Sequence, residues 1–229
     1  MTAKKQTILL LTLIFLPPIF ILLSREFFTN NYFFSSLYKI IFLSPILYRL
    51  YIEGKNPKQS IIENFVYEKF RKNIFSALSI GILLSLVYLA SFFLFQDSLD
   101  TQTIITKLQD IISLNHNNIL FIGLYIIVIN SLLEEFFWRG FLFAKLQTLI
   151  TPWKASVISG IAFSFHHMMF YSTWFTPVFF IIATLGLVLY SIIMNFLYQK
   201  YQDVLSCWLV HAMVDTVQIF IALKIFGII

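Results

Sequence analysis

Long apolar runs without charged side chains constrain the fold of this chain most strongly. Ile74 to Phe95 and Pro177 to Leu197 contain no charged residue. About 20 apolar residues in a helix span the hydrocarbon core of a bilayer, so both runs predict transmembrane helices. The whole chain has the same character, because 59% of its residues are hydrophobic and 12% are charged, against about 25% charged residues in soluble proteins. The sequence predicts an all-α, polytopic integral membrane helix bundle with about seven to eight transmembrane helices.

We divide the chain into two parts of one structural unit. Residues 1–118 are expected to form the N-terminal transmembrane helices, with a cytoplasmic amphipathic segment near residues 57–73. Apolar residues recur at helical spacing in that hydrophilic segment, which predicts a surface helix. Lys39 interrupts the expected span Tyr32 to Tyr51, and we interpret it as structural. Residues 119–229 form the second part, which we expect to be the functional core.

The distribution of basic residues predicts the orientation in the membrane. Most of them, such as Lys55 and Lys58, fall in loops on one side, whereas Arg25 and Lys107 fall on the other. Loops rich in lysine and arginine are cytoplasmic, which predicts a multi-pass protein of the cell membrane with a cytoplasmic N terminus. The net charge of +5 is spread between apolar runs, so nucleic acid is not an expected partner. The single Cys207 excludes an internal disulfide and a thiolate metal cluster.

A small set of ionisable side chains interrupts the apolar segments of the second part. They are Glu134, Glu135, Arg139, His166, His167, His211 and Asp215. One charge at the centre of a transmembrane helix costs roughly 2.5 to 3.5 kcal/mol, so this set needs mutual pairing, water or a function. Residues four apart share a helix face, which predicts a Glu135–Arg139 pair and places His211 beside Asp215. Glu134 is rotated by about 100° from Glu135 and is the candidate general base.

Each of these residues also has a simpler structural explanation. Glu135 and Arg139 can form a salt bridge at a helix end, and His167 or His211 taken singly can bond across the bundle. Structural pairs do not require two adjacent glutamates, an arginine, histidines and an aspartate in three apolar segments. Proton transfer and oxyanion stabilisation do require such groups, so we interpret them as one site.

The order of these residues resembles a known family. Glu134-Glu135-x-x-x-Arg139, then Phe163-x-x-x-His167, then His211-x-x-x-Asp215 are similar to the motifs of the CPBP family of intramembrane proteases. That family comprises the type II CAAX prenyl endopeptidases and the bacteriocin-processing or bacteriocin-immunity (Abi) proteins. The resemblance covers roughly residues 119–220.

The resemblance implies an endopeptidase that hydrolyses a peptide bond within the membrane. The implied site residues are Glu134, Glu135, Arg139, His167, His211 and Asp215. Glu134 and His167 would activate water, His211 and residue 215 would stabilise the oxyanion, and the Glu135–Arg139 pair would organise the site. The spacing from Phe163 selects His167, although the adjacent His166 is an alternative at this stage.

The resemblance leaves two possibilities for a cofactor. Family members have been described both as metalloproteases and as metal-independent glutamate proteases. Glu134, His167 and His211 can bind zinc through one carboxylate and two imidazoles. We favour the reading that requires no cofactor, because the adjacent glutamates lack the His-Glu-x-x-His arrangement of a helical zinc site. The expected partners are the lipid bilayer and a peptide or membrane-protein substrate, prenylated or not.

Two other functions stay open. A proton-coupled membrane transporter would use buried glutamate, histidine and aspartate as a relay, but the sequence contains no internal repeat or pair of broken helices. A non-catalytic membrane scaffold or immunity protein would only bind a partner, and the complete motif set argues against it.

Overall fold

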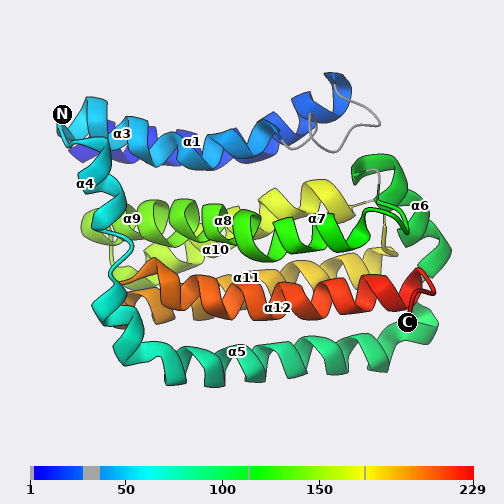
Figure 1. Ribbon diagram of the computed structural model, residues 1–229. Helices are drawn as coiled ribbons and strands as arrows, with labels where there is room; N and C mark the ends of the chain where they lie inside the picture. Colours follow the sequence, from blue (N-terminus) through cyan, green and yellow to red (C-terminus); the bar gives the residue numbers. More distant parts are fainter. Residues whose placement is uncertain (1–2, 28–36, 113, 173) are drawn as a thin grey trace.

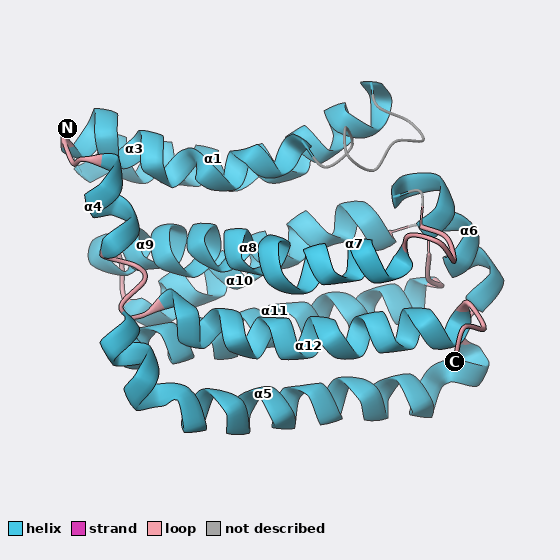
Figure 2. Ribbon diagram, in the orientation of Figure 1, coloured by secondary structure: helices cyan, strands magenta, loops and turns pink. Residues whose placement is uncertain are grey.

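The computed structural model is a bundle of helices that lie side by side with their axes roughly aligned (Figure 1). It describes residues 3–27, 37–112, 114–172 and 174–229. Within these ranges every regular element is a helix and no strand occurs (Figure 2). The predicted all-α membrane bundle is therefore confirmed.

The elements include two 3₁₀ helices, η1 and η2, and two π-helical turns, η3 and η4, among the α-helices. In chain order they are α1 (Ala3–Phe27), η1 (Leu37–Leu43), α3 (Ser44–Glu53), α4 (Pro57–Ile62), α5 (Tyr67–Phe95), η2 (Gln96–Ser98), α6 (Thr101–Ile112), α7 (Ile119–Tyr125), η3 (Ile126–Asn130), α8 (Ser131–Phe137), η4 (Trp138–Phe143), α9 (Ala144–Leu149), α10 (Pro152–Tyr171), α11 (Pro177–Tyr201) and α12 (Val204–Ile225).

In the described part of the chain, 4 helical segments are long and apolar enough to cross a membrane. They are Tyr67–Ser98, Ile119–Leu149, Pro177–Tyr201 and Val204–Ile225, and a shorter apolar helix covers Ile8–Leu23. The larger number of about seven to eight spans stays a prediction. Of the expected second span, residues 32–36 lie outside the described residues, and the rest is divided between η1 and α3, whose first turn contains Pro45.

One continuous helical run, Ile119–Leu149, carries both adjacent glutamates. The π-helical turns η3 and η4 lie on either side of α8 within it. Single π-helical turns inside α-helices occur frequently at functional sites. The run ends before Pro152, which begins α10. Proline favours the first turn of a helix, so this position predicts the start of a new helix.

The part of this run formed by α8 and η4 lies in the interior of the bundle. α12 packs against α5 and α8, α10 packs against α11 and α1, and η1 packs against α1 and α8. In Figure 1, α5 forms one side of the bundle, and α1 with α3 forms the opposite side. Large aromatic side chains such as Phe137, Trp138, Phe141 and Phe163 fill the interior. The polar face of α8 is therefore enclosed by other helices.

The segment near residues 57–73 is not the single surface helix that its spacing predicts. α4 ends at Ile62 and α5 begins at Tyr67. Between them, Asn64 is 2% exposed, and its backbone carbonyl accepts a hydrogen bond from the Val204 amide at 3.0 Å. Contact with the start of α12 therefore overrides the local helical periodicity.

The same segment is attached to η4 by a close backbone contact. Arg49 Nη2 donates to the Gly140 carbonyl at 3.1 Å, and its Nη1 donates to Glu63 Oε2 at 3.1 Å. A Cβ atom at Gly140 would lie 2.7 Å from Asn64 Oδ1 and 2.8 Å from Val204 Cγ2. Glycine is needed at this position so that three segments can meet.

We expect Gly140→Ala to lower the free energy of unfolding by about 1 to 3 kcal/mol, because the added methyl group overpacks this contact. Gly186→Ala in α11 is the matched control, since a Cβ atom at Gly186 meets nothing within 4 Å. Thermal unfolding of both purified variants in detergent measures the difference. Equal stability of the two variants would contradict the packing described for Gly140.

Candidate active site

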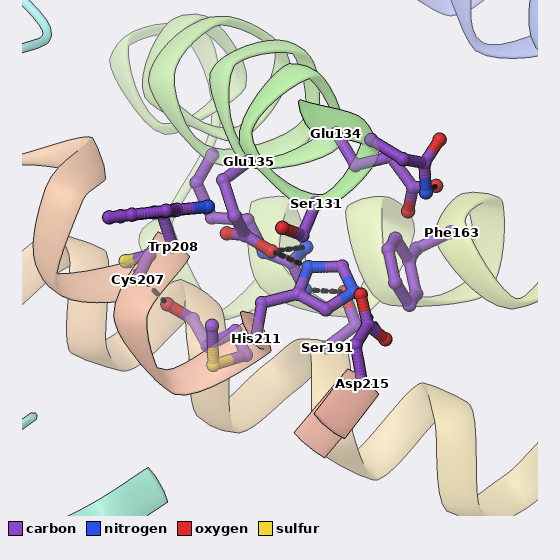
Figure 3. Close-up of polar contacts among 12 residues, drawn as sticks. Ser131, Glu134, Glu135, Phe163, Ser191, Cys207, Trp208, His211 and Asp215 are labelled. Carbon is purple, nitrogen blue, oxygen red and sulfur yellow. Dashed lines mark hydrogen bonds and ion pairs between the residues drawn. The ribbon is translucent and has the colours of Figure 1, made fainter. Parts of the chain in front are cut away.

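α8 places two adjacent carboxylates inside the bundle. Glu134 is 3% exposed and Glu135 is 0% exposed. Successive helical residues are rotated by about 100°, so the two side chains leave α8 in different directions (Figure 3). They have different partners, and the site consequently has two halves.

Glu135 is the acceptor at the centre of a buried ion network. Its Oε1 atom lies 2.8 Å from Arg139 Nη1 and 2.7 Å from His211 Nδ1. Because a carboxylate accepts hydrogen bonds, Nδ1 of His211 carries a hydrogen and the Nε2 atom points away from Glu135. The predicted Glu135–Arg139 pair is confirmed, and the bond to His211 links it to α12.

Arg139 extends the network to two further helices. Its Nη2 atom donates to Ser191 Oγ at 3.0 Å. The guanidinium carbon lies 4.5 Å from the centroid of the Phe163 ring and 5.9 Å from that of Tyr190. Aromatic ring faces attract cations, so α10 and α11 hold the guanidinium against Glu135.

Glu134 has one oxygen held by the protein and one directed to a histidine. Oε1 accepts a hydrogen bond from Asn130 Nδ2 at 2.8 Å. Oε2 lies 3.7 Å from His167 Nε2, beyond hydrogen-bond distance. It has no hydrogen-bond partner among the described residues. Glu134 thus presents an acceptor toward His167.

His167 presents a second acceptor to the same position. Its Nδ1 atom lies 2.9 Å from the Phe163 carbonyl oxygen. A carbonyl can only accept, so Nδ1 carries the hydrogen and Nε2 is an acceptor in the neutral ring. Two acceptors that face each other match a molecule with two O–H donors, such as water. Of the adjacent histidines, His167 is therefore the one suited to act with Glu134.

His166 packs among aromatic rings beside this pair. Its ring centroid lies 5.5 Å from that of Phe42 and 5.9 Å from that of Trp138. Glu134, His166 and His167 each offer one ligand atom, and these atoms lie within 4.8 Å of one another. One carboxylate and two imidazoles are a donor set that zinc accepts. His211, a zinc candidate from the sequence, is not part of this group of described residues.

Asp215 lies one helical turn from His211, as the spacing predicts. The distance from Asp215 Oδ1 to His211 Nε2 is 3.6 Å, which is too long for a hydrogen bond. The orientation of the His211 ring therefore comes from Glu135 rather than from Asp215.

The Phe163 ring joins the two halves of the site. Its centroid lies 4.4 Å from that of His167 and 6.3 Å from that of His211. The predicted site residues Glu134, Glu135, Arg139, His167, His211 and Asp215 therefore lie in one region of the interior.

Three polar neighbours were not predicted: Asn130, Ser191 and Tyr190. Asn130 precedes Glu134 by four residues in an apolar run, and this spacing is a signal that could have identified it. Ser191 and Tyr190 lie in an uncharged span, where no sequence pattern distinguishes them.

Comparison with protein families assigns this region. Residues 116–217 match the model of the type II CAAX prenyl endopeptidase Rce1-like family. This segment is similar to that family. The Rce1-like segment contains every predicted site residue, which confirms the resemblance to the CPBP family. Comparisons with curated proteins and with solved structures found no match.

The Rce1-like family supplies the general activity. Its members are CAAX-type endopeptidases, and the described helices include 4 that can cross a membrane. The chain is therefore a protease integral to the membrane, and its substrate contains a peptide bond. The helices η1 and α5 lie before residue 116 in the chain, so they are outside the Rce1-like segment.

We expect Glu135→Gln to reduce the folding yield and to lower the free energy of unfolding by about 3 to 5 kcal/mol. The amide leaves the buried Arg139 charge without its counter-charge, and an unpaired buried charge is strongly destabilising. Glu68→Gln is the control, since this glutamate also pairs with an arginine but is 71% exposed. Yield and thermal unfolding in detergent are the measurements, and a Glu135→Gln protein as stable as the control would contradict the network.

Proposed function

We propose that this chain hydrolyses a peptide bond within the membrane by means of a water molecule that Glu134 and His167 activate. The observation that carries the proposal is the pair of acceptors, Glu134 Oε2 and His167 Nε2, that face each other at 3.7 Å. A water oxygen about 2.8 Å from both atoms can donate one hydrogen to each.

In this mechanism Glu134 is the general base. It takes one proton as the water oxygen attacks the carbonyl carbon of the peptide, and the carbonyl oxygen becomes negative. The same proton then passes to the nitrogen of the leaving amine, so the carboxylate is regenerated as the C–N bond breaks. The bond from Asn130 to Oε1 supports this role, because it leaves Oε2 for the proton transfer.

His211 is suited to stabilise the oxyanion. Its Nδ1 atom is held by Glu135, so the opposite atom, Nε2, is directed into the site. When the imidazole is protonated, its Nε2–H can donate to the developing oxyanion. Glu135 and Arg139 then act by positioning His211 and do not need to contact the substrate.

We propose that the reaction proceeds without a metal. A zinc ion held by Glu134, His166 and His167 would supply Lewis-acid activation of water. The Lys39 ammonium interacts electrostatically with Glu134 and with His166. A zinc ion bound by these residues would be repelled by that ammonium. This repulsion supports the metal-free reading.

We propose a substrate of the class that the family description names, a prenylated protein or peptide with a carboxy-terminal CAAX motif. The support is the Rce1-like match alone. A prenylated CAAX peptide and the same peptide without its prenyl group are the two probes that separate this class from other membrane peptides.

Glu134→Gln is expected to abolish release of the terminal peptide and to leave thermal unfolding unchanged, because an amide cannot accept the proton from water. The purified variant is compared with the parent and with Glu68→Gln, using the prenylated CAAX peptide in detergent. Normal cleavage by Glu134→Gln would show that Glu134 is not the base. A folded parent that cleaves neither probe would favour the non-catalytic scaffold.

Asp215→Asn, assayed with and without a strong chelator, tests the metal-free mechanism. We expect activity near the parent level and little effect of the chelator, since the amide supplies a hydrogen-bond donor beside the oxyanion. Asp110→Asn, on the exposed surface of α6, is the control. Loss of activity in Asp215→Asn together with chelator inhibition of the parent would favour a bound metal, because loss of a supporting carboxylate weakens metal sites about 10- to 100-fold.

A further inference from the structure

Lys39 is a buried cation contributed by the first part of the chain. It lies on η1, outside the Rce1-like segment, and is 8% exposed. A lysine so enclosed in a membrane bundle needs a counter-charge or a function, because removing an ammonium from water is strongly unfavourable.

η1 is packed directly on the helix that carries the glutamates. It contacts both α1 and α8. The ring centroid of its Phe42 lies 5.4 Å from that of Phe137 and 5.5 Å from that of His166. These aromatic contacts fix the backbone of η1 against α8 and α10, so the position of Lys39 is set by the core.

The surroundings of the Lys39 ammonium come from four helices. Its Nζ atom lies 4.9 Å from the centroid of the Tyr125 ring of α7. Glu134 of α8, His166 of α10 and Asp215 of α12 lie close enough to interact electrostatically with it. Lys39 is therefore a buried cation beside the ionisable side chains of the site.

The other cation of the site is directed elsewhere. Arg139 is bonded to Glu135 at 2.8 Å and to Ser191 at 3.0 Å, and Glu135 is also bonded to His211. The negative charge of Glu135 is thus paired with Arg139 and His211 within its own half of the site. Lys39 adds a positive charge that interacts with Glu134 from outside this network.

We propose that Lys39 is a positioning residue of the active site, whose fixed positive charge holds the Glu134 carboxylate toward the reacting water and stabilises the negative charge that moves from it to the peptide carbonyl oxygen. This inference rests on the proposed function of Glu134. A fixed charge near developing negative charge acts on the chemical step more than on substrate binding. Lys39 would then act on kcat and leave KM nearly unchanged.

The test compares Lys39→Met and Lys39→Gln, which remove the charge, with Lys39→Arg, which keeps it. We expect kcat for the prenylated CAAX peptide to fall at least about tenfold in both uncharged variants, with KM unchanged, and to recover in Lys39→Arg. Lys224→Met is the matched control, since Lys224 also lies over an aromatic ring, 5.9 Å from the Phe93 centroid, but more than two turns beyond Asp215 on α12. Thermal unfolding of each variant is measured in the same detergent.

Several outcomes would overturn the inference. Parent-level kcat in an uncharged variant would show that the charge does not assist the reaction. A raised KM with unchanged kcat would make Lys39 a substrate-binding residue. An inactive Lys39→Arg, or a loss of kcat that parallels a loss of stability, would show that the packing of the side chain matters rather than its charge. Glu134→Gln assayed in parallel separates the two proposals, because its cleavage of the peptide would refute the function of Glu134 itself.

Discussion

The site depends on a carboxylate that is fully enclosed between a guanidinium and an imidazole. Glu135 is 0% exposed and accepts bonds from Arg139 and His211. Separation of any one partner would leave a charge in an apolar interior, which is strongly unfavourable. α8 and α12 are thereby kept in one relative position. Because Glu134 immediately precedes Glu135 in α8, its direction is fixed by the same contact.

The two halves of the site differ in the partners that surround their carboxylates. The half with Glu135 is closed by charged and aromatic partners, including Ser191 and the Phe163 ring. The half with Glu134 presents two acceptors, one on Glu134 and one on His167. Such a division separates the groups that maintain the geometry from the groups available for a reaction.

Sequence reasoning was successful where the relevant contact lies within one helix. The spacing of Glu135 and Arg139 predicted their pair, because residues four apart share a helix face. The bond from Glu135 to His211 crosses between helices, and helical periodicity does not encode which neighbour a helix meets. The same reason explains the break after Ile62, where the tertiary contact of Asn64 with α12 interrupts an amphipathic pattern.

The π-helical turns on either side of α8 determine where this chain can change in length. A π-helical turn absorbs one additional residue while the helices before and after it keep their faces. Loss of a residue within Ile126–Asn130 can therefore convert that turn to α-helix without rotating α8. An insertion within the α-helical segment Ser131–Phe137 cannot be accommodated in this way. It would rotate the following residues by about 100°. Neutral single-residue deletions should therefore accumulate within Ile126–Asn130, while the spacing between the two glutamates and Arg139, which lies inside the second π-helical turn, stays constant.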